Sequence, residues 1–170
     1  MENIFNTAIL PPNEEQRLEN LKKYKIFGTQ SEVIFNQLAA VTATLLKVPV
    51  AMINFVDKDN VWTKADQKGG NGQITARSMS LCSLAILNDS ITVFEDAVKD
   101  PFLMMNPWIA DYTDLRFYAA APITTSEGFN IGAVCIVDKT KRTFSSREQK
   151  KLEWIAAVVR AELEKRTDPD

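Results

Sequence analysis

The order of the patterned segments constrains this fold most, because two hairpin patterns lie between helical patterns at both ends of the chain. Residues 50–56 form a short apolar run rich in β-branched side chains, and turn-forming residues separate it from a returning run at 61–65. A second pair joins 115–124 to 129–137. Strands and helices do not alternate, so we predict an α+β domain whose antiparallel sheet carries helices on one face.

Two helices are predicted before the first hairpin. Asn13 is a candidate N-cap, with acidic residues leading and lysines trailing, and Gly28 closes this helix. Thr29 and Glu32 have the spacing of a second capping box, and apolar residues then recur every three to four positions up to Pro49. The second helix is therefore expected to have one apolar face.

A third long helix is predicted near the end of the chain, where Ser145 and Glu148 form another capping box. Its apolar stripe consists of Leu152, Ile155, Ala156, Val159 and Leu163. A short apolar helix at 80–87 and a brief strand at 91–94 are predicted between the two hairpins.

Two segments are expected to be loops. Gly69, Gly70 and Gly72 gather in one connection that lacks the Lys and Ser/Thr of a phosphate-binding loop, so we interpret it as a flexible link. Residues 95–114 are rich in turn formers yet carry many apolar side chains. That segment is either a lid over a ligand or a plug that seals the core of the domain itself.

The chain contains no histidine and only two cysteines, Cys82 and Cys135. A Ser-His-Asp triad, a Cys-His pair and a His-containing zinc site are therefore impossible, and two thiols cannot make a four-thiolate zinc site. The cysteines lie about fifty residues apart in apolar stretches, which favours two buried, reduced thiols.

Composition argues against nucleic-acid and membrane partners. Twenty basic residues nearly balance twenty-two acidic ones, and no apolar run or signal-like start is present, so we predict a cytoplasmic protein. One local basic stretch lacks interleaved aromatic residues and is interpreted as a solvated face. It comprises Lys139, Lys141, Arg142, Arg147, Lys150 and Lys151.

In sequence order, the motifs of the chain resemble those of a GAF domain, a bacterial sensory and regulatory module. The match runs from residue 14 to 166, after an N-terminal extension at 1–13 and before a short tail at 167–170. The residues that carry it are Ile26 to Thr29, Asn54 to Asp57, Trp62, Ser80, Cys82, Asp96, Ala97, Asp100, Pro101, Asn106, Pro107, Arg116 to Ala119, Ala121, Pro122, Gly132 and Cys135 to Asp138.

The resemblance implies a twisted antiparallel sheet of five to six strands, with the terminal helices on one face and a ligand cavity on the other. Loops and the short helix would roof this cavity, which makes a lid at 95–114 the favoured interpretation over a plug. Carried over from the family, the ligand-binding residues would be Trp62, Cys82, Asp96, Met105, Asn106, Arg116 and Tyr118. Each has a structural alternative: Trp62 and Tyr118 as core, Asn106 as a turn cap, and Arg116 as the ion-pair partner of Asp96 or Asp114.

The departures from the family pattern reduce the number of ligand classes that we expect. Ser83 and Leu84 stand where related members carry a His after the cysteine, and Ala120 stands where a glycine is common. The chain also lacks the Asp-Ile-Pro motif of bilin-binding relatives, so we reject a bilin chromophore. No Asn-Lys dipeptide of the cyclic-nucleotide signature occurs, which leaves cyclic GMP unsupported, and we expect no cofactor.

Three functions follow from the resemblance. The favoured one is a non-catalytic module that senses an unknown small molecule, signals in trans to a protein partner, and forms a homodimer through its terminal helices. A GAF-type free-methionine sulfoxide reductase would need a resolving cysteine near Cys82, and Cys135 is remote in sequence. The third is a pure interaction domain whose cavity is filled by its own side chains.

Overall fold

The computed structural model describes residues 10–104 and 115–167 of the chain. Within them, six strands form one antiparallel sheet in the order β3-β2-β1-β6-β5-β4. The strands are β1 (Val50–Val56), β2 (Asn60–Asp66), β3 (Ile74–Ala76), β4 (Thr92–Phe94), β5 (Phe117–Thr124) and β6 (Asn130–Asp138). The predicted α+β class with an antiparallel sheet is confirmed.

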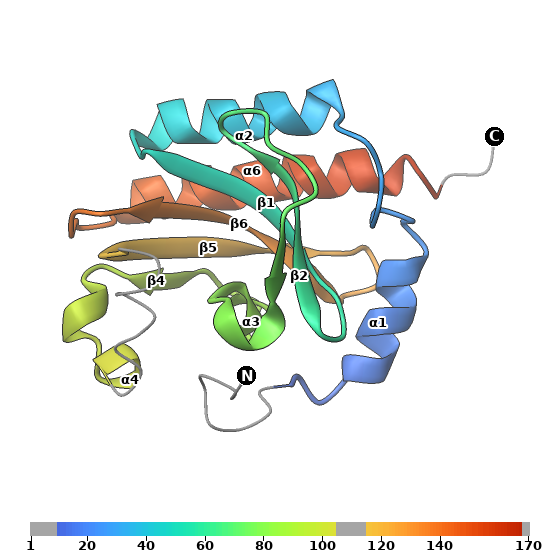
Figure 1. Ribbon diagram of the computed structural model, residues 1–170, viewed down its shortest axis with the longest axis horizontal. Coiled ribbons are helices and arrows are strands. Elements are labelled where there is room, and N and C mark those ends of the chain that lie inside the picture. The colour runs from blue at the N-terminus through green and yellow to red at the C-terminus, as the bar shows by residue number, and fades with distance from the viewer. Residues whose placement is uncertain (1–9, 105–114, 168–170) are drawn as a thin grey trace.

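Helices cover the two faces of the sheet differently (Figure 1). The long helices α2 (Val33–Leu46) and α6 (Ser146–Glu164) pack on one face, and α1 (Glu14–Lys22) lies at the ends of β1 and β6. The opposite side carries the one-turn helices α3 (Cys82–Ala85) and α4 (Pro101–Met104). Two 3₁₀ turns, Arg77–Met79 and Ala97–Lys99, precede α3 and α4.

Of the three predicted helix caps, only the last forms. The Ser145 hydroxyl accepts from the Glu148 amide at 3.2 Å, and the Glu148 carboxylate accepts from the Ser145 amide at 3.1 Å. The Asn13 side chain makes no capping bond. The capping box predicted for Thr29 and Glu32 is wrong, because the Thr29 hydroxyl donates to the Ile26 carbonyl and the Glu32 carboxylate pairs with Lys64.

A bulge in β2 explains why Glu32 pairs with Lys64 instead of capping the helix. Asn54 faces Thr63 and Ile53 faces Ala65, so Lys64 is the extra residue between two paired positions. Its side chain points to the helical side and is completely buried. There the ammonium donates to the Gln30 carbonyl at 2.6 Å and to the Thr29 hydroxyl at 2.8 Å. The bulge thus anchors the link between α1 and α2 on the sheet.

Both faces of the central strands are buried, because helices cover one face and the α3 region covers the other. On β1, Ile53 and Phe55 belong to the core beneath α2 and α6, whereas Val56 belongs to a second cluster around α3. The apolar stripe predicted for the last helix is buried in the first of these cores, as expected. Covering both faces makes these strands apolar throughout rather than alternating.

Sequence reasoning missed the shortest elements. β3 lies just after the glycine-rich link, and α4 lies within the predicted loop 95–114. Residues 105–114, the second half of the predicted lid, are outside the described residues, so the lid stays a prediction. Among the helices that the structure does describe, none has the length and apolar character needed to cross a bilayer.

Candidate functional site

A cavity of about 550 Å³ lies between the sheet and the segment 73–82, on the face opposite α2 and α6. Alternate residues of the central strands point into it: Asn54 from β1, Thr63 from β2, Tyr118 from β5 and Cys135 from β6. Cys82 enters from the start of α3. Apolar side chains make up much of the remaining wall, namely Met52, Val61, Met79, Leu81 and Val137.

The two cysteines meet at one amide group in this cavity. The side-chain nitrogen of Asn54 donates to Sγ of Cys82 at 3.4 Å and to Sγ of Cys135 at 3.5 Å. The Thr63 hydroxyl donates to Oδ1 of Asn54 at 2.8 Å, which fixes the amide with its nitrogen toward the sulfurs. Residues from three strands and one helix therefore build a single polar cluster.

Tyr118 adds a third contact to the same cluster, because its hydroxyl lies 3.3 Å from Sγ of Cys82. The pKa of the Cys82 thiol is lowered to about 6, chiefly by a hydrogen bond from Cys135. Burial alone would raise this pKa, and the contacts with Asn54 and Tyr118 lower it further. The hydrogen bond to Cys82, together with burial, raises the pKa of Cys135. Burial and the neighbouring thiols likewise raise the pKa of Tyr118. The arrangement favours one thiolate at Cys82, held by neutral donors.

Of the five predicted site residues that the structure describes, Cys82 and Tyr118 line this cavity, and Trp62, Asp96 and Arg116 do not. The expectation that Trp62 lines it needs correction. Trp62 alternates with Val61 and Thr63 along β2, so its ring faces the helical core, where it lies 5.6 Å from the ring of Phe27. This is the structural alternative that the sequence left open for Trp62.

Asp96 and Arg116 also lie away from the cavity. The Arg116 guanidinium donates to both carboxylate oxygens of Asp96, at 3.1 and 3.2 Å, and neither side chain lines the 550 Å³ cavity. Arg116 therefore takes its structural alternative, with Asp96 as the partner. Met105 and Asn106 fall outside the described residues.

Sequence reasoning missed Asn54, Thr63 and Cys135 as site residues. Asn54 is the one polar residue within the apolar run of β1, and that position was the available signal. The distance of Cys135 from Cys82 in sequence predicts a structural thiol instead. Only the register that sets Cys135 opposite Met52 and Ala120 reveals that it lies beside β1 and beneath α3.

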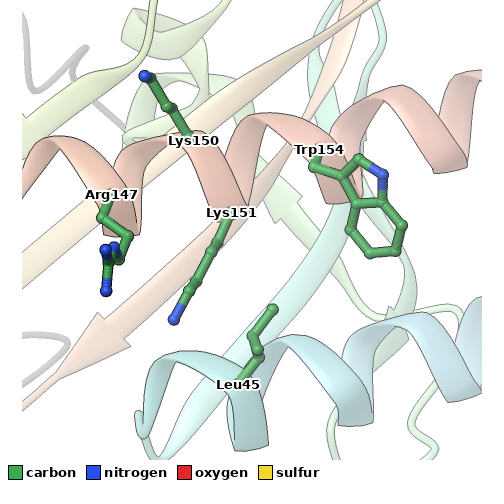
Figure 2. Close-up of a pocket in the computed structure, with 5 residues that line it drawn as sticks. All are labelled: Leu45, Arg147, Lys150, Lys151 and Trp154. Atoms are coloured by element: carbon green, nitrogen blue, oxygen red, sulfur yellow. The ribbon is translucent and has the colours of Figure 1, made fainter.

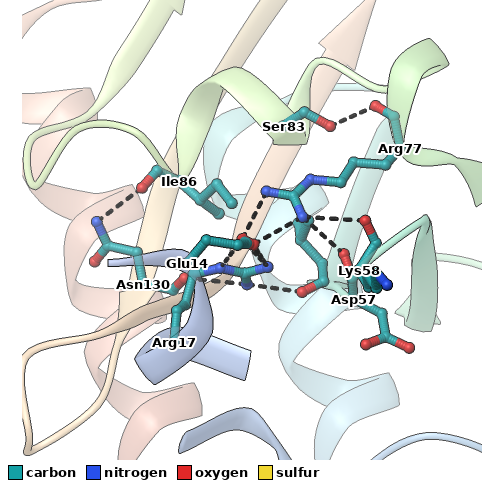
Figure 3. A network of polar contacts seen from close by, with 9 residues as sticks. Glu14, Arg17, Asp57, Lys58, Arg77, Ser83, Ile86 and Asn130 are labelled. Atoms are coloured by element: carbon teal, nitrogen blue, oxygen red, sulfur yellow. Dashed lines mark hydrogen bonds and ion pairs between the residues drawn. The ribbon is translucent and has the colours of Figure 1, made fainter. Parts of the chain in front are cut away.

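A charged cluster joins the cavity wall to α1 (Figure 3). Arg77 follows Ala76 of the wall, and its guanidinium donates to the Glu14 carboxylate through two nitrogens. Glu14 also accepts from the buried Arg17, which in turn donates to the Val56 carbonyl at 2.7 Å. The Ser83 hydroxyl of α3 donates to the Arg77 carbonyl. Segments from four parts of the chain converge here.

The outer surface of α2 and α6 holds a separate hollow of about 420 Å³ (Figure 2). Leu45 of α2 and Trp154 of α6 form its apolar part, and Trp154 is 61% exposed. Three residues of the basic stretch line it as well, namely Arg147, Lys150 and Lys151. Lys139, Lys141, Arg147 and Lys150 of the basic stretch are exposed, as predicted, whereas the partly buried Arg142 donates to the Leu46 and Lys47 carbonyls. The stretch also borders the exposed side chain of Trp154.

Several solved structures have a fold similar to that of this chain. The GAF domain of PixJ from Thermosynechococcus elongatus superposes with a TM-score of 0.63 at 14% identity, covering 86% of this chain and 88% of that one. The GAF domain region of a Geobacter sulfurreducens protein gives 0.61 at 16%, covering 89% and 97%. A type II free methionine-R-sulfoxide reductase from Thermoplasma acidophilum gives 0.57 at 17%, covering 77% and 92%.

At the level of sequence, no protein-family model matches the chain. A cyclic di-GMP phosphodiesterase of Pseudomonas aeruginosa is 29% identical over 158 residues, which amount to 92% of this chain. The chain spans 27% of the length of that relative.

Proposed function

On the premise that this chain has the GAF fold, we propose that it is a non-catalytic regulatory module that binds a small molecule in the cavity beside Cys82 and Tyr118. The observation that carries the proposal is the 550 Å³ cavity itself. Its volume lies within the range of about 300 to 1,000 Å³ that is usual for ligand sites, and a few polar groups interrupt a largely apolar wall.

The lining favours a neutral ligand. Among the residues that the structure describes, no Asp, Glu, Lys or Arg lines this cavity, whereas Asn54, Thr63, Ser80 and Tyr118 supply neutral hydrogen-bonding groups. A phosphate would enter without a compensating cation, and desolvating an unpaired charge is costly. Cyclic nucleotides therefore remain unsupported, and a compact molecule with an apolar body fits better.

A contact between the cavity wall and α1 also supports a regulatory role. Arg77 adjoins the cavity wall and binds Glu14, so a ligand that moves residues 74–82 would alter the contact of that segment with α1. The Pseudomonas aeruginosa relative bears the name of a signalling enzyme and matches this chain over a segment of its length. We propose the corresponding regulatory role here, with the output exerted on a protein partner.

A thermal-shift screen of neutral metabolites tests ligand binding. A ligand at 100 times its Kd stabilises the folded state by about 2.7 kcal/mol. The variant Ala76→Phe places a ring in the cavity wall and should abolish the shift, whereas Ala40→Phe, on the exposed side of α2, should retain it. A ligand that stabilises the protein and Ala76→Phe equally binds elsewhere, and a screen without any shift refutes ligand sensing.

We also propose a homodimer through the outer surface of α2 and α6. Val41, Leu45 and Trp154 expose 48%, 38% and 61% of their surface there, whereas the predicted stripe of α6 is buried against the sheet and cannot contribute. Sedimentation equilibrium at micromolar concentration should show a dimer that Trp154→Glu dissociates. A monomer at that concentration excludes the dimer.

A thiol reductase is the second candidate, because Cys82 and Cys135 are close in space despite their separation in sequence. A resolving thiol near the nucleophile is what such chemistry requires. Thioredoxin-dependent consumption of free methionine sulfoxide that is lost in Cys82→Ser would establish this activity in place of the non-catalytic role.

A further inference from the structure

The geometry points to a modification site at the base of the cavity, where we propose that a small hydroperoxide oxidises Cys82 and Cys135 to an intramolecular disulfide. This proposal depends neither on a bound ligand nor on reductase activity. It rests on the contacts and burial of two cysteines that are both free thiols in the structure, and on the elements that carry them.

The two sulfurs are already neighbours. One amide nitrogen, that of Asn54, donates to both of them, to Sγ of Cys82 at 3.4 Å and to Sγ of Cys135 at 3.5 Å. Cys135 is fixed within β6, whereas Cys82 begins α3, a helix of only four residues. Because a one-turn helix has few internal hydrogen bonds to preserve, a small shift of α3 is the natural way to reach the separation of a disulfide.

The roles of the two cysteines differ. Cys82 accepts a hydrogen bond from Asn54, and its sulfur lies 3.3 Å from the Tyr118 hydroxyl. Cys135, Asn54 and Tyr118 together lower the pKa of the Cys82 thiol to about 6, so it is the thiolate at neutral pH. The thiolate is the form that attacks an oxidant. Cys135 keeps its proton because its pKa is raised, and it is the resolving thiol that reacts in the second step.

The burial of both sulfur atoms limits the size of the oxidant that can reach them. Cys82 is 2% exposed and Cys135 is wholly buried, so a bulky disulfide such as oxidised glutathione cannot approach either sulfur. Hydrogen peroxide and the smallest alkyl hydroperoxides are neutral, and they fit a cavity that no Asp, Glu, Lys or Arg lines among the described residues. A small hydroperoxide is therefore the chemical class expected at this site.

The reaction balances in two steps. The Cys82 thiolate attacks the terminal oxygen of the hydroperoxide, the O–O bond breaks, and Cys82 becomes a sulfenic acid while the departing alkoxide or hydroxide takes up a proton. Cys135 then loses its proton and attacks the Cys82 sulfur, the S–O bond breaks, and the expelled hydroxide leaves as water. Two thiols lose two electrons in total, and the hydroperoxide gains them.

The test treats the intact protein with hydrogen peroxide and measures its mass and free thiols. We expect a monomer that has lost two hydrogens and both thiols, and that recovers them with dithiothreitol. Cys135→Ser should stop at a sulfenic acid that dimedone traps, and Cys82→Ser should retain its Cys135 thiol. A disulfide between two molecules, or equal oxidation of Cys135 in Cys82→Ser, overturns the proposal.

A matched pair of tyrosine variants tests whether the cluster activates Cys82. Tyr118→Phe removes the hydroxyl that contacts Cys82, and Tyr24→Phe removes a hydroxyl that donates to Glu164 far from the cavity. At a pH of about 6, one lost hydrogen bond should slow peroxide consumption by Tyr118→Phe about fivefold, whereas Tyr24→Phe should match the unmodified protein. Equal rates in all three proteins contradict the assigned role of the cluster.

Discussion

Glu14 accepts hydrogen bonds from Arg77 through both carboxylate oxygens, each at 2.9 Å, across 63 residues of sequence. The same carboxylate also binds Arg17, which is 1% exposed, so one acid compensates two guanidinium groups that are largely withdrawn from water. The pair holds the first helix against the segment that continues into the cavity wall.

Replacing Glu14 with Gln should destabilise the protein by about 3 kcal/mol, because two buried cations would lose their shared counter-charge. Urea unfolding monitored by tryptophan fluorescence measures the change. Glu19→Gln is the matched control, since Glu19 makes an exposed pair with Lys22 and its loss should cost less than about 0.5 kcal/mol. Equal stabilities of the two variants would show that the buried cluster contributes nothing.

The same cluster makes stability depend on acid pH. Burial raises the pKa of Glu14, but hydrogen bonds from Arg77 and Arg17 outweigh it and hold the pKa below its ordinary value. A carboxylate with a lowered folded-state pKa contributes stability above its unfolded pKa and loses it as the pH falls through the folded value. Stability should therefore fall below a pH of about 4.5, and less steeply in Glu14→Gln.

Lys64 should be as important on the other face of the sheet. Its ammonium is fully buried and is held by Thr29, the Gln30 carbonyl and Glu32. Lys64→Met removes the donor of the Gln30 carbonyl and one of the two cations that bind Glu32, the other being Arg166, and should cost about 2 kcal/mol in urea unfolding. Lys22→Met is the control, because the side chain of Lys22 is 73% exposed, and it should change stability by less than about 0.5 kcal/mol.

Gly132 should tolerate no side chain. A Cβ at this position of β6 would collide with the backbone carbonyl oxygen of Asn54 on β1, which cannot move without breaking the strand pairing. Gly132→Ala should therefore destabilise by about 3 kcal/mol in thermal or urea unfolding. In Gly70→Ala the atoms nearest to the new methyl group belong to the Asp66 side chain, which can shift at the cost of its bonds to the Lys68 and Gly70 amides. A loss as large as that of Gly132→Ala would therefore contradict the clash.

Alkylation reports the ionisation of Cys82 directly. Because hydrogen bonds from Cys135, Asn54 and Tyr118 lower its pKa to about 6, the rate of reaction with a small alkylating agent should rise to a plateau with a midpoint near pH 6. Peptide mass spectrometry assigns the modified residue. A midpoint above pH 8 would mean that burial outweighs the hydrogen bonds at this thiol.

Local patterns predicted most of the regular elements. The capping box at Ser145 and the apolar stripe of α6 were sufficient because helix caps and helix faces depend on residues within a few positions of one another. The pattern at Thr29 and Glu32 has the same spacing, yet it failed because buried Lys64, which is distant in sequence, recruits both side chains. The residue spacing of a motif gives no information about a competing partner that is distant in sequence.

Composition and short-range periodicity were enough to predict the α+β class and the two hairpins and to exclude histidine chemistry. Which side chains share the cavity depends on contacts between segments that are distant in the chain. The alternation along β2 turned Trp62 away from it, and the pairing of β6 with β1 brought Cys135 to the Asn54 amide beside Cys82. Strand register and helix placement set those contacts, and both arise from packing between segments that are remote in the chain.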